Sequence, residues 1–238
     1  MRPSLFRQLI SSRPIWLAWQ ILWRVGLGAF GALIIVLILL NFVNPPLSSE
    51  MLREQFHGRP ITQTWVPIEQ ISPHLIQAVV MSEDGQFCRH SGVDWRQVRV
   101  AWQSARGGAK KPRGASTITM QLVKNLFLWS ERSYVRKAIE VPLAYMVGLA
   151  WSKRRQMEIY LNIVEWAPGV YGAEAAARAH FRRSARALTA TQAALMAASL
   201  PNPIVRRAGK AGPHTRRIAS IILKRMAGAG PWVSCLYK

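Results

Sequence analysis

The chain has 238 residues and a mass of 26.8 kDa, enough for one sizeable domain with an appendage but too short for two catalytic domains. Half of its residues are hydrophobic, which argues against an ordinary soluble protein and suggests a membrane-spanning segment. The formal charge of +21 calls for an anionic surface or a polyanionic partner such as nucleic acid, acidic lipid or a phosphorylated substrate.

The first predicted element is a membrane span over residues 25–43. Its core, VGLGAFGALIIVLILL, carries no charge, and Pro45 and Pro46 follow it. About 19 helical residues cross a hydrocarbon core of roughly 30 Å. The preceding residues 1–24 contain arginines and no acid, so the positive-inside rule predicts a cytoplasmic N-terminus and an outer position for everything after Asn44. We expect an uncleaved signal anchor; a cleaved signal peptide and a buried core helix are the alternatives.

Residues 44–71 predict a linker and membrane-proximal segment, with a small strand or extended piece in TQTWVPIEQI. With this topology, Cys88 and Cys235 face an oxidising compartment. The sequence leaves open whether they form one disulfide or remain two separate thiols, because it does not show that their Cα atoms approach.

Residues 72–238 predict a mainly α domain. The first expected helix has Ser72 as its N-cap, begins at Pro73 and ends near Gly85. A flexible basic loop is expected at 107–114 and a turn at 169–172. Further helices are expected over 116–125, 133–149 with a kink at Pro142, 152–162, 173–180, 189–200 and 214–226.

Two acids stand together at the end of the first of these helices, in a chain with only 11 acids in total. Glu83 and Asp84 lie where the helix macrodipole disfavours negative charge, which should raise the pKa of a carboxyl group and suit it to act as a general base. The alternative is an ordinary solvated helix end. His90, considered alone, predicts packing or capping rather than catalysis.

A second candidate site lies on the helix predicted over 133–149. Arg132, Arg136 and Glu140 are spaced i, i+4 and i+8, with Lys137 beside them, so they share one face. The pattern fits exposed ion pairs on a surface helix as well as it fits guanidinium groups that bind a departing diphosphate. Lys124, on the preceding helix, could reach the same place.

Four segments, EDGQFCRHSG, GASTITMQ, RKAIE and KRRQMEIYLN, follow one another in an order and at intervals that resemble the peptidoglycan glycosyltransferases, glycosyltransferase family 51. The resemblance covers about residues 72–203. It implies a mainly helical, lysozyme-like domain with a smaller membrane-proximal subdomain. The absence of S-x-x-K and K-T-G motifs after residue 203 predicts the monofunctional form, without a transpeptidase domain.

The resemblance also implies roles for individual residues. Glu83 corresponds to the base that deprotonates the acceptor 4-hydroxyl, and Glu140 to the second acid, beside the diphosphate. The implied substrate-binding residues are Ser116, Thr117, Gln121, Lys124, Arg132, Arg136, Lys137, Lys153 and Asn162. Two positions depart from the family pattern: Met120 replaces a frequent glutamine and receives no polar role, and Ala167 replaces a common glycine.

The implied reaction joins lipid II, an undecaprenyl-diphosphate-linked disaccharide-pentapeptide, into β-1,4 glycan strands with inversion. It predicts an enzyme of the bacterial inner membrane whose partners are lipid II, the growing glycan, the membrane and other cell-wall synthesis proteins. No metal ligand is assigned, although Mg²⁺ or Mn²⁺ at the diphosphate is an open expectation. Two alternatives are a membrane-bound lytic transglycosylase and a non-enzymatic basic membrane protein; binding of nucleic acid is not expected on the outer side.

Overall fold

The computed structural model describes residues 13–107, 114–131 and 133–237. The chain divides into two units, residues 1–44 and 45–238. In the first unit, helix α2 (Arg13–Phe42) contains the segment Ile15–Phe42, which is long and apolar enough to cross a membrane. The helix begins well before residue 25, where the span was predicted, because residues 15–23 are mostly apolar and Arg24 is itself a good helix former.

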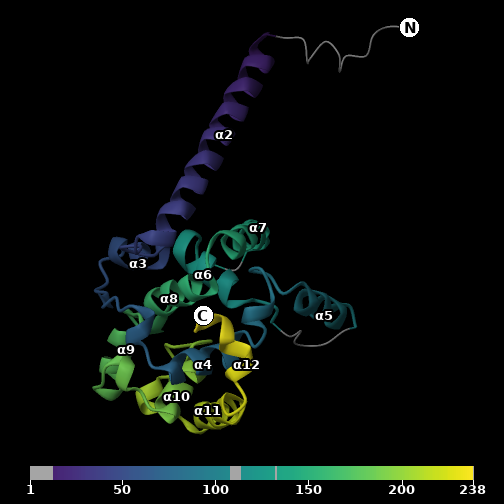
Figure 1. Ribbon diagram of the computed structural model, residues 1–238. Coiled ribbons are helices and arrows are strands. Elements are labelled where there is room, and N and C mark those ends of the chain that lie inside the picture. Colours follow the sequence, from purple (N-terminus) through teal and green to yellow (C-terminus); the bar gives the residue numbers. More distant parts are fainter. Residues whose placement is uncertain (1–12, 108–113, 132, 238) are drawn as a thin grey trace. The chain divides into compact units, whose positions relative to one another are not determined.

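The second unit is helical, with one small sheet (Figure 1). Its core surrounds α4 (Pro73–Glu83), which packs against α10 (Ala190–Ser199) and α11 (Pro213–Met226). Leu75, Ala78 and Val79 of α4 are fully buried. Alanines dominate the buried face of α10, and such small side chains allow close packing between helices.

A second group of helices carries most of the predicted site residues. Helix α6 (Ile118–Phe127) packs against α7 (Tyr134–Ala150) and α8 (Lys153–Ile163). Their first turns are capped by Thr117, Ser133 and Ser152, whose hydroxyl oxygens accept backbone N–H bonds. Helix α7 continues through Pro142 as one helix, as the range predicted over 133–149 implied. Two further short helices are α9 (Ala173–Phe181) and α12 (Gly230–Val233). The 3₁₀ turns are η1 (Ile68–Gln70), η2 (Phe87–Arg89), η3 (Ala185–Ala187), η4 (Ala208–Lys210) and η5 (Ser234–Leu236).

Several elements were not predicted from the sequence. The segment treated as a linker contains α3 (Ser49–Phe56), and α5 (Trp95–Arg106) follows the first motif. The carboxylate of Asp94 caps α5 by accepting the N–H groups of Arg96 and Gln97, so an Asp before an amphipathic run was the available signal. The predicted turn at 169–172 belongs to a hairpin of β2 (Glu165–Ala167) and β3 (Val170–Tyr171). The small strand expected in TQTWVPIEQI is β1 (Thr62–Gln63), which pairs in parallel with β3 and gives the order β1-β3-β2.

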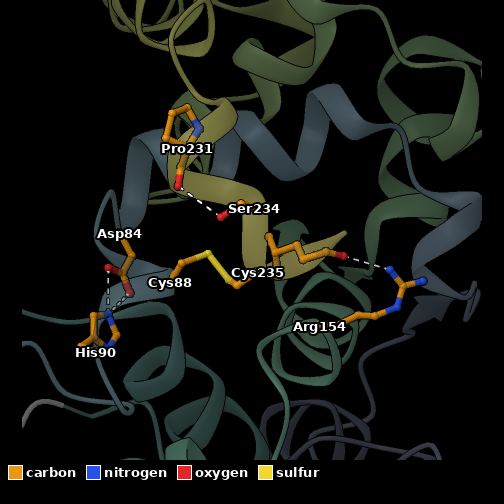
Figure 2. Close-up of a disulfide and its surroundings, with 8 residues drawn as sticks. Asp84, Cys88, His90, Arg154, Pro231, Ser234 and Cys235 are labelled. Atoms are coloured by element: carbon orange, nitrogen blue, oxygen red, sulfur yellow. Dashed lines mark hydrogen bonds and ion pairs between the residues drawn. A yellow bond between two sulfur atoms is a disulfide. The ribbon is translucent and has the colours of Figure 1, made fainter. Parts of the chain in front are cut away.

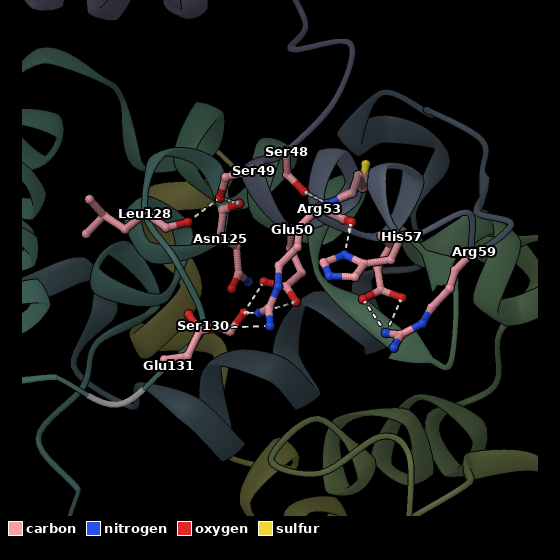
Figure 3. A network of polar contacts seen from close by, with 12 residues as sticks. Ser48, Ser49, Glu50, Arg53, His57, Arg59, Asn125, Leu128, Ser130 and Glu131 are labelled. Atoms are coloured by element: carbon pink, nitrogen blue, oxygen red, sulfur yellow. Dashed lines mark hydrogen bonds and ion pairs between the residues drawn. The ribbon is translucent and has the colours of Figure 1, made fainter.

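Tertiary hydrogen bonds explain why α3 forms although its sequence is short and polar (Figure 3). The Ser49 hydroxyl donates to the carbonyl of Asn125, 2.9 Å away, and also to the carbonyl of Leu128, at the end of α6. Ser130 donates to Glu50 and accepts a bond from Arg53. Helix α3 is therefore attached to the carbonyl end of α6, where otherwise unpaired carbonyl groups need donors.

The two cysteines form a disulfide, which resolves the question that the sequence left open. Cys88 in η2 is bonded to Cys235 in η5, 147 residues later (Figure 2). Beside this bond, the Arg154 guanidinium donates to the carbonyl of Leu236 at 3.0 Å. The end of the described chain is therefore fixed beside the segment that follows Glu83.

Candidate active site

Glu83 is the last residue of α4 and lies half-buried on a cavity of about 500 Å³. Its Oε2 accepts a hydrogen bond from Gln121 Nε2 at 2.9 Å. The side-chain amide oxygen of Gln121, Oε1, in turn accepts a hydrogen bond from the Tyr160 hydroxyl at 2.8 Å. Ser82 donates to the other carboxylate oxygen at 3.1 Å. The carboxylate is therefore oriented by neutral donors and has no cation as a direct partner among the described residues.

Burial is the main reason that the pKa of Glu83 is raised above its ordinary value of 4.5. The hydrogen bonds from Gln121 and Ser82 lower that pKa in part, while the negative charge of Asp84 adds to the increase. The sequence predicted the direction of the shift but assigned it to the helix macrodipole. The structure identifies desolvation as the larger cause.

Asp84 connects the Glu83 turn to the start of α6. Its buried carboxylate accepts the backbone N–H of Ile118 at 3.0 Å and contacts His90 Nε2 at 3.0 Å. An acid at a helix N-terminus is favoured by the helix dipole. Asp84 therefore orients the loop after Glu83, and His90 supports it.

Glycines let the same loop lie directly on α7. Gly92 has φ +88, and a Cβ there would be 2.0 Å from the carbonyl oxygen of Ala144. A Cβ on Gly148 would be 2.4 Å from the backbone of Ser91. Only glycine permits both the backbone conformation at residue 92 and this close approach. The packing fixes the Glu83 loop against the helix that carries Glu140.

Glu140 lies within a compact group of charged residues on α7. It is 1% exposed, and its two carboxylate oxygens accept from Arg136 Nη1 and from Lys137 Nζ, the latter at 2.6 Å. Arg136 is also buried and donates through Nε to the carbonyl of Glu131 at 3.0 Å. The sequence left exposed ion pairs as an equal alternative, and the burial of Arg136 and Glu140 excludes it. Arg132 lies outside the described residues.

Lys124 adds a positive charge from α6, one turn after Gln121. Burial lowers the pKa of Lys124, and the nearby positive charge of Arg136 lowers it further, whereas Glu140 and Glu50 oppose that shift. Lys124 and Gln121 also line a second cavity of about 220 Å³. Gln121 therefore borders this second cavity together with Lys124, while its side-chain amide bonds the Glu83 carboxylate that lines the first.

Ser116 and Thr117 form the entry to α6. The Thr117 hydroxyl donates to the carbonyl of Gly92 at 2.5 Å and accepts from the N–H of Met120. Its hydrogen bonds are therefore made within the protein. Ser116 lines the Glu83 cavity and is 3.5 Å from Lys137 Nζ. Ser116 therefore lies between the cavity that Glu83 lines and the charged group around Glu140. Met120 is buried, consistent with its apolar side chain.

Lys153 and Asn162 lie behind the cavity rather than on it. The buried Lys153 Nζ has no hydrogen-bond partner among the described residues and lies 4.2 Å from the centroid of the Phe87 ring. Burial lowers the pKa of Lys153 to about 8, with Asp84 opposing the shift. The Asn162 side chain bonds the backbone of Val66 in both directions and the carbonyl of Glu158, so it joins α8 to the segment after β1.

The side chains at Glu140 do not fit a divalent metal ion. Both of its carboxylate oxygens already accept bonds from cationic groups. Within the described parts of the chain, no three His, Cys, Asp or Glu side chains are grouped as a metal site would need. Among the described residues, Lys124, Arg136 and Lys137 supply the positive charge around Glu140.

Arg225 and Trp232 also line the Glu83 cavity, and neither residue was predicted from the sequence. Arg225 is in the last turn of α11, and Trp232 is in α12. Both are more than 140 residues from Glu83 along the chain, and neither belongs to one of the four motifs. No local pattern could have identified them, because only the fold brings them to the site.

Comparisons with known proteins agree with this geometry. The family model described as Transglycosylase matches residues 49–227. Proteins named "Biosynthetic peptidoglycan transglycosylase" are similar over most of the chain. The one from Rhizobium meliloti (strain 1021) is 54% identical over 204 residues, 86% of each chain. The one from Rhizobium etli is 48% identical over 232 residues, 98% of each chain, and the one from Brucella suis is 50% identical over 208 residues, 86% of this chain and 92% of its own.

Proposed function

The chain belongs to the transglycosylase family, and from this premise we propose how its site polymerises a peptidoglycan glycan. It is a glycosyltransferase of cell-wall synthesis. The proposed substrate is lipid II, the undecaprenyl-diphosphate-linked disaccharide-pentapeptide. One observation supports the mechanism most strongly: a half-buried carboxylate held by neutral donors faces a cavity, and the buried Arg136 and the part-exposed Lys137 surround Glu140 on α7.

Glu83 is proposed as the general base. Desolvation raises its pKa, which strengthens a carboxylate as a proton acceptor at neutral pH. Glu83 takes the proton of the acceptor sugar's 4-hydroxyl, whose oxygen then bonds to the anomeric carbon of the donor. The bond to the diphosphate breaks with its electron pair, and the new linkage is β because the attack is on the opposite face. Gln121 keeps the carboxylate oriented during the transfer.

The leaving diphosphate is proposed to bind near Glu140. Lys124, Arg136 and Lys137 provide cationic donors, and Ser116 provides a hydroxyl at the edge of the Glu83 cavity. Cations that are already in place stabilise the charge that develops on the leaving group without reorganisation. Glu140 is proposed to hold Arg136 and Lys137 in position. Arg132, by its place in the motif, is proposed to add to this group.

Lys153, Asn162 and Thr117 are proposed to support the cavity. Lys153 places a charge beneath the Glu83 loop, and Asn162 fixes α8, which carries the Tyr160 hydroxyl that orients Gln121. Thr117 fixes the entry to α6. These three residues are therefore proposed to act on substrate through the groups they hold.

We propose that α2 anchors the enzyme in the inner membrane, with residues 1–24 in the cytoplasm and residues 44–71 leading to a catalytic domain, 72–238, on the outer side. The Cys88–Cys235 disulfide supports this orientation, since disulfides persist in oxidising compartments. A C-terminal reporter that is active only in the cytoplasm would contradict it. The expected result is a signal from a reporter that requires the periplasm.

The function is tested by supplying the purified full-length protein in detergent with lipid II. We expect glycan strands that a muramidase digests, together with release of undecaprenyl diphosphate. Failure to form polymer, combined with solubilisation of preformed sacculi, would identify a cleaving enzyme instead. A parallel assay with a chelator tests metal dependence, and we expect most of the polymerisation rate to remain.

A further inference from the structure

The last part of the chain forms one wall of the cavity that contains Glu83. Arg225 and Trp232 line this cavity together with Glu83 and Ser116. Trp232 lies after residue 227, where the match to the family model ends. The wall is therefore completed by a segment that the family model does not include.

This wall is firmly attached to the residues around Glu83. The Cys88–Cys235 disulfide joins η2 to η5, and the Arg89 guanidinium lies 4.0 Å from the centroid of the Trp232 ring. Arg225 Nη1 donates to the carbonyl of Met81 at 3.3 Å. A site that is already ordered before binding loses less entropy when ligand enters. The Trp232 ring and the Arg225 side chain thus have a defined position beside the base.

The chemistry of the wall differs from that of the rest of the cavity. Of the described residues that line it, Arg225 is the only one with a cationic side chain and Trp232 the only aromatic one. The other lining side chains are mostly acidic, amide or hydroxyl groups. A carbohydrate with an acidic substituent needs hydrogen-bonding groups, an apolar surface for its ring and a cation for its carboxylates.

We propose that Trp232 and Arg225 form a subsite for the peptide-bearing amino sugar next to the reacting hydroxyl. Trp232 packs against the sugar ring, and Arg225 binds a carboxylate of the attached peptide, for which a guanidinium group is well shaped. This proposal rests on the proposed function, because it takes the substrate to be the disaccharide-pentapeptide. It assigns to the C-terminal segment a part in selecting the acceptor.

The test measures KM and kcat for lipid II with Trp232→Ala, Trp232→Phe and Arg225→Ala in the full-length protein. We expect KM to rise about tenfold for Trp232→Ala with kcat within about twofold of the parent, because uniform binding is lost. Trp232→Phe should recover most of the affinity. Arg225→Ala should raise KM about fivefold, and this difference should vanish with a substrate whose peptide carboxylates are amidated.

Matched controls lie on the same elements but away from the cavity. Tyr237→Ala removes another aromatic side chain from the C-terminal segment, and Arg217→Ala removes another exposed arginine from α11. Both should leave KM and kcat unchanged. If Trp232→Ala fails to fold, Trp232→Leu keeps an apolar side chain against Arg89 and removes only the flat ring.

The outcomes separate this inference from the proposed function. If the parent enzyme polymerises lipid II while the Trp232 and Arg225 variants keep its KM, the subsite does not exist. A fall in kcat with unchanged KM would also overturn it, because the wall would then only position the Glu83 loop. Equilibrium binding of the soluble disaccharide-pentapeptide to Glu83→Gln, with and without Trp232→Ala, measures the subsite without turnover; equal affinities would contradict it.

Discussion

Glu83 and Glu140 are the same residue type in opposite surroundings. Glu83 is half-buried among neutral donors and opens onto a cavity, whereas Glu140 is almost fully buried and each of its oxygens accepts from a cation. The first carboxylate is available to a substrate proton, and the second is occupied in holding positive charge. The environment, not the residue type, therefore separates the two proposed roles.

The largest expected effect comes from Glu83→Gln, which keeps the shape of the side chain but removes its basicity. We expect the polymerisation rate to fall by about 10²- to 10⁴-fold, the usual contribution of a general base, with lipid II binding largely retained. Single-turnover kinetics and equilibrium binding measure the two effects. A substantial remaining rate would remove Glu83 from its role.

Stability provides an internal control for this variant. Because the folded-state pKa of Glu83 lies above 4.5, its protonated form favours folding below that pH, and this contribution is lost as pH rises through the folded-state pKa. At neutral pH the ionised side chain therefore costs stability. Glu83→Gln should unfold no earlier on heating than the parent protein at pH 7, so its lost activity cannot arise from unfolding.

The second prediction concerns the other acid. Arg136→Ala leaves the buried Glu140 with one cation and should lower the free energy of unfolding by about 3 to 5 kcal/mol. Lys137→Ala is the matched control, because the Lys137 side chain is 42% exposed and its pair should contribute only about 1 kcal/mol or less. Urea unfolding measures both. Equal losses would show that burial does not distinguish the two cations.

The third prediction uses the covalent attachment of the Glu83 loop. Cys235→Ser opens the Cys88–Cys235 ring and should lower the free energy of unfolding by about 2 to 4 kcal/mol under oxidising conditions. Treatment of the parent protein with dithiothreitol should produce the same loss, and the variant should not respond to it. An effect of dithiothreitol on the variant would mean that the loss has another origin.

The smallest effect is a shift in pH dependence. As the proposed general base, Glu83 must be ionised to accept a proton, so the polymerisation rate should fall as pH drops through the raised pKa of Glu83. The hydrogen bond from Gln121 lowers that pKa, and Gln121→Leu should therefore move the acidic limb of kcat/KM to higher pH by about one unit or less. Ser82→Ala removes the weaker donor and should move the acidic limb of kcat/KM by a smaller amount. A shift to lower pH would contradict the proposed part of Gln121.

Much of the fold was readable from helical periodicity and capping residues. The expected starts at Ser133 and Ser152 are the observed N-caps of α7 and α8. Ser72 is the N-cap residue of α4, as predicted, although its hydroxyl donates to the carbonyl of Leu188 and makes no capping bond. Helix α6, expected from residue 116, begins at Ile118, and Thr117 caps it.

Helix α3 was missed because it is held by hydrogen bonds to residues more than 70 positions away, which sequence patterns do not contain. Strand β1 lies where a small strand was expected, but its pairing with a strand more than 100 positions later could not be predicted. The same limit applies to the site. The sequence suggested Glu83, Glu140 and the basic residues, but the bond from Gln121 to Glu83 and the burial of Glu140 come from tertiary packing.

The disulfide has a further consequence for resistance to proteases. It closes a covalent ring from Cys88 to Cys235 that includes every proposed substrate-binding residue, from Ser116 to Trp232. A single backbone cleavage at an exposed point of this ring, such as Val205, would leave both fragments joined. A nicked enzyme would thus keep its proposed substrate-binding groups on one covalently connected molecule.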